Sequence, residues 1–197
     1  MSKPKLSVYA SVAEAAALAD TRSGGCFWVA YSGGLDSTVL LEAAREVVGP
    51  TGCKVVHVNH GLNANAADWQ SQCEKVASEM GLPIKVFHAE LEVGNEELAG
   101  RRARYGIWSR LIRERDVLAT AHHADDVAET RLWQLLTGRS PIGIPANRSL
   151  GEGIVVRPFL DLERKELELF ARERHLSWIE EDSNLNEAYD RNWIRHK

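Results

Sequence analysis

Six consecutive residues, Ser32-Gly33-Gly34-Leu35-Asp36-Ser37, have the composition of a phosphate-binding turn. They follow an apolar run and precede residues with helical apolar spacing, so backbone N–H groups and the positive end of a helix dipole converge on them. The two glycines allow positive φ and close approach of an anion, and the two serine hydroxyls can donate hydrogen bonds. The segment therefore predicts an anion site between a strand and a helix.

Asp36 is the acidic residue of this turn, and a carboxylate beside a phosphate is unfavourable unless a cation offsets both charges. We therefore expect Asp36 to hold Mg²⁺ against the phosphates. The alternative is a helix N-cap, in which Asp36 or Ser37 only satisfies N–H groups at the start of the helix. The lysine and spacing of the GTPase P-loop are absent, which excludes that class of site.

A second polar cluster, which contains His122, His123, Asp125 and Asp126, follows a later apolar run. Opposite a phosphate turn, these side chains would bring a general base, a metal ligand and an anionic pocket for an ammonium group into one cleft. The alternative is that the two carboxylates only cap the helix that begins there.

Two further groups of residues could reach the same cleft. His57 and His60 lie at the end of a predicted strand, where they are either site residues or ordinary strand-end histidines. Arg101, Arg104 and Tyr105 follow Glu97 at helical spacing, so these four residues share one broad helix face. Taken alone, that face is typical of a solvated, salt-bridged surface.

The elements that position these residues alternate between strand and helix, which predicts an α/β fold: a mainly parallel, Rossmann-like sheet with helices on both faces. The loop from Thr137 to Gly153 is too long for a simple connector, so we expect a functional lid there. The predicted strands span 26–31, 54–59, 84–88, 117–121 and 154–157, and the predicted helices 12–18, 37–48, 66–80, 96–114, 125–136 and 164–174.

Composition places few other limits on function. The 197 residues suit one domain, 1–197, with its strongest core at 26–175, and the net charge of -4 does not indicate a nucleic-acid binder.

No apolar segment of the N-terminus resembles a signal or a membrane span, so we expect a cytoplasmic protein with no membrane partner. The three cysteines lack a C-x-x-C spacing, which argues against a metal cluster and predicts three small buried hydrophobes, Cys26, Cys53 and Cys73.

The S-G-G-L-D-S turn resembles the signature of the PP-loop ATP pyrophosphatases, which cleave ATP between its α and β phosphates. Within that family, H-V-N-H-G-L at 57–62, E-x-x-x-R-x-x-R-Y at 97–105 and H-x-x-D-D-x-x-E-T at 122–130 are similar to segments of the lysidine synthetases. The tail is also similar: E-E-D-S-N at 180–184 resembles the family's E-D-x-S-N, except that Glu181 stands where aspartate is usual, and Y-D-R-N-x-x-R at 189–195 resembles the segment that follows it.

The resemblance implies ATP and Mg²⁺ as cofactors and tRNA(Ile) and L-lysine as partners. It implies that the wobble cytidine is first adenylated and that lysine then displaces AMP. The implied ATP site contains the turn residues Ser32, Gly33, Gly34, Leu35, Asp36 and Ser37, together with Val58 and His60 beside the adenine.

The resemblance also assigns the remaining roles. Asp36 and Asp125 would be metal ligands, with His123 or Asp125 assisting the metal and proton transfer, and Asp126 would bind the lysine substrate. Arg104 would reach the active site, and Arg191 or Arg195 would stabilise developing charge.

Two rival hypotheses remain from the sequence. One is another PP-loop enzyme, such as a tRNA thiolase or an amidotransferase-type synthetase, and the other is a non-catalytic nucleotide-binding module on the same fold. Family members usually carry a more glycine-rich loop than the one at 137–143, so the role of that loop is open. They also usually continue into C-terminal tRNA-binding domains, which we expect to be absent from this chain.

Overall fold

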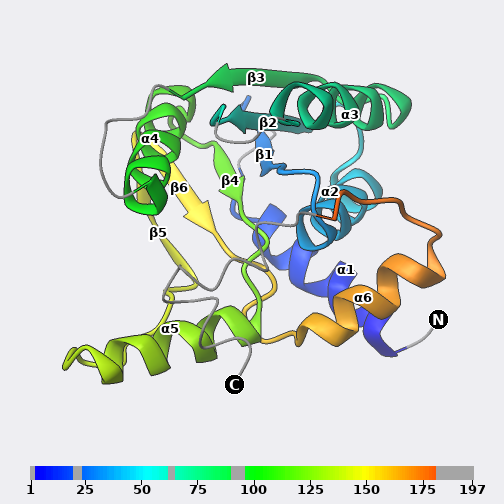
Figure 1. The fold of residues 1–197 in the computed structure, drawn as a ribbon. Coiled ribbons are helices and arrows are strands. Elements are labelled where there is room, and N and C mark those ends of the chain that lie inside the picture. Colours follow the sequence, from blue (N-terminus) through cyan, green and yellow to red (C-terminus); the bar gives the residue numbers. More distant parts are fainter. Residues whose placement is uncertain (1–2, 20–23, 62–64, 90–95, 181–197) are drawn as a thin grey trace.

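The computed structural model describes residues 3–19, 24–61, 65–89 and 96–180, and it contains one six-stranded sheet (Figure 1). The strand order is β3-β2-β1-β4-β6-β5, and every neighbouring pair is parallel except β5 and β6. The strands are β1 (Phe27–Ala30), β2 (Cys53–Asn59), β3 (Ile84–His88), β4 (Val117–Ala119), β5 (Asn147–Leu150) and β6 (Gly153–Val156).

Helices connect the parallel strands, as the alternating sequence pattern predicted. They are α1 (Lys3–Ala16), α2 (Leu35–Val48), α3 (Ala66–Glu79), α4 (Glu96–Leu111), α5 (Ala124–Leu136) and α6 (Arg164–Glu173). In the described part of the chain, no helix is both long enough and apolar enough to cross a bilayer.

Two apolar clusters on opposite faces hold the sheet between its helices. Side chains alternate along β1, so Phe27 and Val29 pack with α1, α2, α3 and α6, whereas Trp28 packs with α4. Burial of large side chains such as Phe27 contributes about 1.5–3 kcal/mol each, which makes these two layers the main source of stability. The prediction of helices on both faces is therefore confirmed.

The topology creates the cleft. From β1 the chain passes through α2 to β2 on one side, whereas β4, on the other side of β1, is reached later through α4. In parallel α/β sheets, ligands bind beyond the carboxyl ends of strands at such a reversal of strand order. The turn that follows β1 and the polar segment that follows β4 therefore lie at the same edge of the sheet.

Four sequence predictions need correction. Helix α1 spans Lys3–Ala16 rather than 12–18, because Val8, one turn before Val12, packs into the same apolar cluster and extends the buried face of the helix. Residues 147–150 form strand β5, which pairs with β6 as a hairpin, so the loop after α5 ends earlier than expected. Helix α4 ends at Leu111 rather than at Glu114, because Asp116 accepts the backbone N–H of Arg113 and ends the helix in a tight turn. Cys53 and Cys73 are buried, but Cys26 is only partly buried because it precedes β1 at the rim of the sheet.

Candidate functional site

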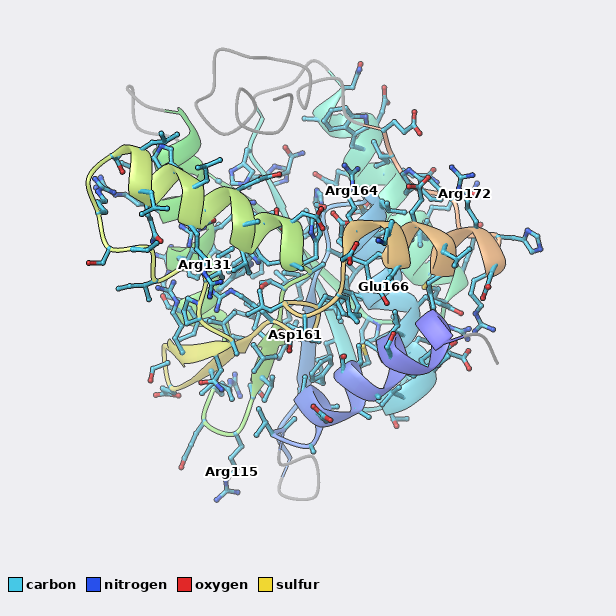
Figure 2. All side chains as sticks on the ribbon, turned by 90° about the horizontal axis from the view of Figure 1, so that it is seen from below. Arg115, Arg131, Asp161, Arg164, Glu166 and Arg172 are labelled. Atoms are coloured by element: carbon cyan, nitrogen blue, oxygen red, sulfur yellow. The ribbon has the colours of Figure 1, made fainter. Side chains whose placement is uncertain are left out.

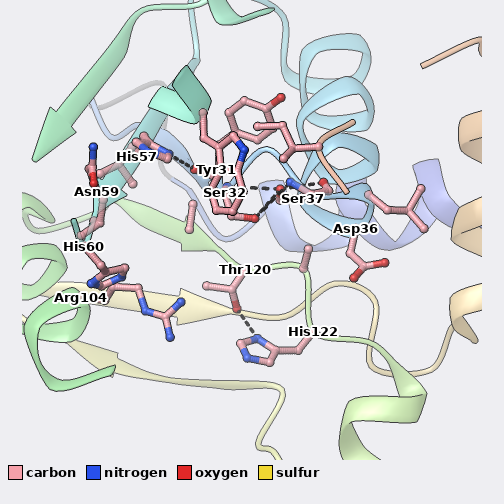
Figure 3. Close-up of a pocket in the computed structure, with 18 of the residues that line it drawn as sticks. Tyr31, Ser32, Asp36, Ser37, His57, Asn59, His60, Arg104, Thr120 and His122 are labelled. Atoms are coloured by element: carbon pink, nitrogen blue, oxygen red, sulfur yellow. Dashed lines mark hydrogen bonds between the residues drawn. The ribbon is translucent and has the colours of Figure 1, made fainter. Parts of the chain in front are cut away.

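A cleft of about 750 Å³ opens at the carboxyl edge of the sheet, between the ends of β1, β2 and β4 (Figure 3). Its wall contains most of the residues that the sequence predicted for the site, and it brings together segments as distant in sequence as Ala30 and Glu180. The predicted residues in the wall are Ser32, Gly34, Leu35, Asp36, Ser37, Val58, His60, Arg104, His123 and Asp126.

The turn after β1 is held in shape by its own hydroxyl groups. The hydroxyls of Ser32 and Ser37 lie 3.0 Å apart in a hydrogen bond, and the Ser37 hydroxyl also donates to the Gly34 carbonyl at 3.0 Å. Thr38 donates to the same carbonyl at 2.9 Å. Because the first backbone N–H groups of a helix have no intrahelical partner, α2 presents donors and its positive dipole end to an anion in the cleft.

Gly33 is required by close packing as well as by its backbone conformation. Its φ is +91°, and a Cβ atom at this position would lie 2.9 Å from Cys73 Sγ and 2.6 Å from Ile179 Cδ1. The Gly33 carbonyl also accepts the backbone N–H of Ile179 at 2.9 Å. Gly33 therefore fixes the turn from behind, whereas Gly34 forms part of the cleft wall.

Three carboxylates surround the buried imidazole of His123, which is 1% exposed. Its Nε2 lies 3.6 Å from Asp36 Oδ2 and 3.5 Å from Asp126 Oδ2, and its Nδ1 lies 3.4 Å from Asp125 Oδ2. These distances suit ion pairing but exceed those of strong hydrogen bonds. The imidazole thus links the turn after β1 to the start of α5.

The charges of this cluster are mutually dependent. Burial lowers the pKa of His123, but the carboxylates of Asp36, Asp126 and Asp125 outweigh it, so the pKa lies above its ordinary value. Burial raises the pKa of Asp126, against the opposing effect of His123. A protonated His123 therefore stabilises the negative charge that these carboxylates bring to one place.

Asp125 and Asp126 are neighbours with different orientations. Asp126 accepts the backbone N–H of His123 at 2.9 Å and faces the cleft, so it both caps α5 and contributes a carboxylate to the wall. Asp125 lies outside the wall, and its Oδ2 accepts the backbone N–H of Arg164 at 2.8 Å at the start of α6. The geometry therefore favours Asp36 and Asp126 over Asp125 as carboxylates that contact a ligand in the cleft.

Asp36 fits the expected role of a metal ligand. Its Oδ1 is buried and lacks a hydrogen-bond partner among the described residues, although an unsatisfied carboxylate oxygen is costly there. Oxygen ligands are those that Mg²⁺ prefers, and a divalent ion beside α2 would satisfy this atom. No group of three or more His, Cys, Asp or Glu side chains in the described ranges forms a ready-made metal site, so a metal here would also need ligand or water oxygens.

The far wall of the cleft is formed by the end of β2. His57 is buried and its Nδ1 lies 2.9 Å from the Tyr31 carbonyl, so it joins the ends of β1 and β2. Val58 and His60 line the cleft, and their place beside an adenine stays a prediction. Burial, with Arg104 and His57 as further causes, lowers the pKa of His60 to about 4.

The pKa of His60 leads to a first prediction. The pKa of His60 is about 4 in the folded state and 6.5 in the unfolded state, so between these values the unfolded state binds more protons. The contribution of His60 to the free energy of unfolding is therefore fully present above pH 6.5 and is lost as pH falls towards 4. We expect His60→Gln to reduce the pH dependence of the urea midpoint in that window, compared with the unmodified chain. NMR titration of the His60 ring should give a midpoint near 4, and a midpoint near 6.5 would contradict the prediction.

Two of the predicted arginines lie in the cleft wall, and two lie outside the described residues. Arg101, Arg104 and Tyr105 of α4 all line the cleft, so the shared helix face does point towards the site. Arg191, Arg195 and the tail motif with Glu181 lie outside the described residues, and their roles stay predictions.

Some cleft residues were missed by reasoning from the sequence. Thr120 Oγ1 lies 3.0 Å from His122 Nδ1, which fixes that ring at the edge of the cleft. Trp69, Trp178 and Ile179 also line the cleft, although only their apolar character could have been recognised in the sequence. Aromatic side chains usually belong to a core, and only the fold shows that these reach a ligand site.

Comparison with known proteins identifies the family of this domain. A model of the PP-loop domain matches residues 8–197. The tRNA(Ile)-lysidine synthase of Pseudomonas fluorescens is 42% identical over 182 residues, which are 88% of this chain and 41% of that protein. The enzyme of the same name from Coxiella burnetii is 38% identical over 183 residues, 89% of this chain and 41% of that protein.

A solved structure supports the fold. The U34-tRNA thiolase NcsA from Methanococcus maripaludis superposes with a TM-score of 0.67 at 18% identity, covering 88% of this chain and 65% of that one. The chain spans about two fifths of the length of the curated relatives that it matches.

Proposed function

The chain belongs to the PP-loop family, and from that premise we propose that it carries the ATP-binding catalytic site of a tRNA(Ile)-lysidine synthetase. One observation supports this most directly: the S-G-G-L-D-S turn and the H-H-A-D-D segment face each other across a single cleft. A phosphate site and a site for an ammonium group are what this reaction needs within reach of one another. We also propose a cytoplasmic location, where ATP and tRNA are available.

The proposed reaction has two displacement steps. The exocyclic oxygen at C2 of the wobble cytidine attacks the α phosphorus of ATP, and the bond to the β phosphate breaks to release pyrophosphate. The ε-amine of lysine then attacks C2, the C2–O bond breaks with AMP as the leaving group, and the nitrogen loses protons. The products are lysidine, AMP and pyrophosphate.

The turn after β1 would bind the phosphates. Its N–H groups and the α2 dipole are fixed before any ligand arrives, so little reorganisation is needed as charge moves onto the leaving pyrophosphate. Asp36 would hold Mg²⁺ through the unsatisfied Oδ1, and the ion would supply charge neutralisation between the phosphates. His60, neutral above pH 6 because of its lowered pKa, would lie against the base with Val58.

The opposite wall would bind lysine. Asp126 faces the cleft and is largely buried, so its carboxylate would pair with the ammonium group with little competition from water. His123 would assist proton transfer, because its Nε2 lies 3.6 Å from Asp36 Oδ2 and 3.5 Å from Asp126 Oδ2. Arg104, with Arg191 or Arg195, would stabilise the negative charge that develops on the leaving AMP.

A direct test is mass spectrometry of tRNA nucleosides after incubation with ATP, Mg²⁺ and lysine. We expect lysidine formation with release of pyrophosphate and AMP, and the product should carry the isotope label of heavy lysine. We expect the chain alone to bind ATP but to modify tRNA poorly, because its net charge of -4 offers few cationic contacts to RNA. A chimera that continues this chain with the C-terminal part of the Pseudomonas fluorescens relative should be faster.

The possible outcomes separate the rival functions. Label from lysine in the nucleoside supports the proposal, whereas sulfur incorporation would identify a thiolase. ATP binding without pyrophosphate release, in both the chain and the chimera, would identify a nucleotide-binding module instead.

A further inference from the structure

Three guanidinium groups gather around the side chain of Tyr105 on α4. The Cζ atoms of Arg148 and Arg101 lie 4.3 Å and 5.0 Å from the centre of its ring. The Nη2 of Arg157 donates to its hydroxyl at 3.1 Å. The three arginines come from different elements, α4, β5 and the end of β6, so only the tertiary structure brings them together.

The positive charge of this group is not balanced by carboxylates. Arg101, Arg148 and Arg157 form no ion pair with an acidic side chain of the described residues. Arg157 is only 4% exposed, and its Nε is buried without a hydrogen-bond partner in the same part of the chain. Clustered like charges repel one another, and a buried cation is costly, so the arrangement is stabilised when an anion binds.

The site lies where a large ligand can reach it. Arg101 and Tyr105 line the cleft, whereas Arg148 is exposed on β5, the outermost strand of the sheet. The group therefore extends from the wall of the nucleotide cleft to the protein surface.

We propose that Tyr105, Arg101 and Arg148, supported by buried Arg157, form a second anion site that binds a backbone phosphate of RNA beside the reacting nucleotide. This inference rests on the proposed function, because it assigns part of the same substrate. A guanidinium is planar and carries donors in a fork that matches two phosphate oxygens, and stacking on a tyrosine ring fixes its orientation.

The position favours an RNA phosphate over the phosphates of ATP. The turn after β1 already offers N–H groups and a helix dipole for the nucleotide, and the arginine group lies on α4 and the β5–β6 hairpin instead. Arg148 faces solvent rather than the interior, as expected for a contact with a polymer that continues beyond the cleft. Phosphate contacts fix the register of a nucleic acid on a protein, so this site would set which nucleotide enters the cleft.

Arg157 would act as a positioning residue. Its Nη1 donates to the Pro145 carbonyl at 2.7 Å, and its Nη2 donates to the Tyr105 hydroxyl. It thus ties the loop before β5 to α4 and holds the Tyr105 ring in the position where Arg101 and Arg148 contact it.

Fluorescence anisotropy with an anticodon stem-loop RNA that carries cytidine at the wobble position tests the site. We expect Arg148→Gln to weaken RNA binding roughly 5- to 10-fold at low salt and to reduce the slope of log affinity against log salt by about 0.7, the value for one lost phosphate contact on a single strand. Arg148→Lys keeps the positive charge but lacks the forked donors of the guanidinium. Its RNA affinity should lie between those of the unmodified chain and Arg148→Gln. ATP affinity should be unchanged in both variants.

Arg115→Gln is the matched control, because it removes the same charge at a different place. Arg115 precedes β4 at the opposite edge of the sheet from the cleft, and in Figure 2 it points away from the body of the molecule, far from Arg164 of the cleft wall. We expect it to change the RNA affinity by less than about twofold. Equal effects of Arg115→Gln and Arg148→Gln would show that only net charge matters and would overturn the proposal.

The Tyr105 phenol gives a second, independent measurement. Burial raises its pKa, but Arg157, Arg101 and Arg148 outweigh burial and hold the pKa below its ordinary value. Binding of the stem-loop RNA should therefore raise the pKa of Tyr105, measured by NMR of labelled tyrosine, and inorganic phosphate should do so only at far higher concentration.

The outcomes distinguish this proposal from the proposed function. RNA binding that leaves the Tyr105 pKa unchanged, or an RNA affinity that Arg148→Gln does not alter, overturns the second anion site even if lysidine is formed. An Arg148-dependent RNA contact, when neither the chain nor the chimera makes lysidine, supports the anion site and overturns the proposed enzyme activity.

Discussion

Asp36→Ala is expected to abolish pyrophosphate release while the protein stays folded, with a loss of at least on the order of 10³-fold. We propose this carboxylate as the metal-binding group of the turn, because its Oδ1 is buried and has no partner among the described residues. Its removal would leave the phosphates without an ordered Mg²⁺ ion and His123 without one of its three carboxylates. Pyrophosphate release in the presence of tRNA and lysine measures the effect.

Two variants make the Asp36 experiment specific. Asp36→Asn keeps the shape of the side chain without its charge, so it should be nearly as inactive as Asp36→Ala. Asp161→Asn removes an exposed carboxylate outside the cleft wall and should behave like the unmodified protein. Circular dichroism and the urea midpoint check the fold. Near-normal turnover of Asp36→Ala in a folded protein would remove Asp36 from the catalytic site.

Asp126→Asn is expected to raise the apparent KM for lysine by about 100-fold, because an ammonium group in a partly buried pocket depends on a paired carboxylate. The dissociation constant for ATP should change by less than about threefold, since we propose that the phosphates bind to the N–H groups of α2, which Asp126 does not supply. Asparagine retains an oxygen that can accept the His123 N–H, so the start of α5 should stay capped. The two constants are measured on the same preparation.

The neighbouring variant Asp125→Asn separates a local charge effect from direct contact with lysine. It removes an equal charge at the same helix start, from a side chain that contacts Arg164 and His123 but lies outside the cleft wall. We expect a much smaller change in the KM for lysine. Equal losses of lysine and ATP binding in Asp126→Asn would assign Asp126 to the metal or the nucleotide instead.

Local sequence determined most of the elements and the phosphate turn. The spacing of apolar residues is a short-range property, so most strands and helices were predicted with their ends within a few residues, and β3 at 84–88 was predicted without error. The start of α1 is the exception, because it was predicted at Val12 and lies at Lys3. The Ser32–Ser37 turn was recognisable because its glycines and serines act on their own backbone.

Elements whose formation depends on a distant partner were not predicted. The residues Asn147 to Leu150 read as loop, and they form β5 because β6 supplies their hydrogen-bond partners. Cys26 was expected to be buried, but its place at the rim of the sheet leaves it partly exposed. The sequence contains no local signal for either outcome, because both depend on where a segment lies relative to the sheet.

The same distinction applies to the site. The sequence by itself determined which residue types could bind phosphate, metal and ammonium, and its motifs were sufficient to identify the family. Only the tertiary structure decided that Asp126 faces the cleft while Asp125 caps the next helix, and that Arg148 and Arg157 meet at Tyr105. Adjacent residues at a helix start point in directions about 100° apart, and the spacing alone does not say which of them faces the cleft. Arg148 and Arg157 lie 43 or more positions from Tyr105, so they meet it only when the strands and helices pack.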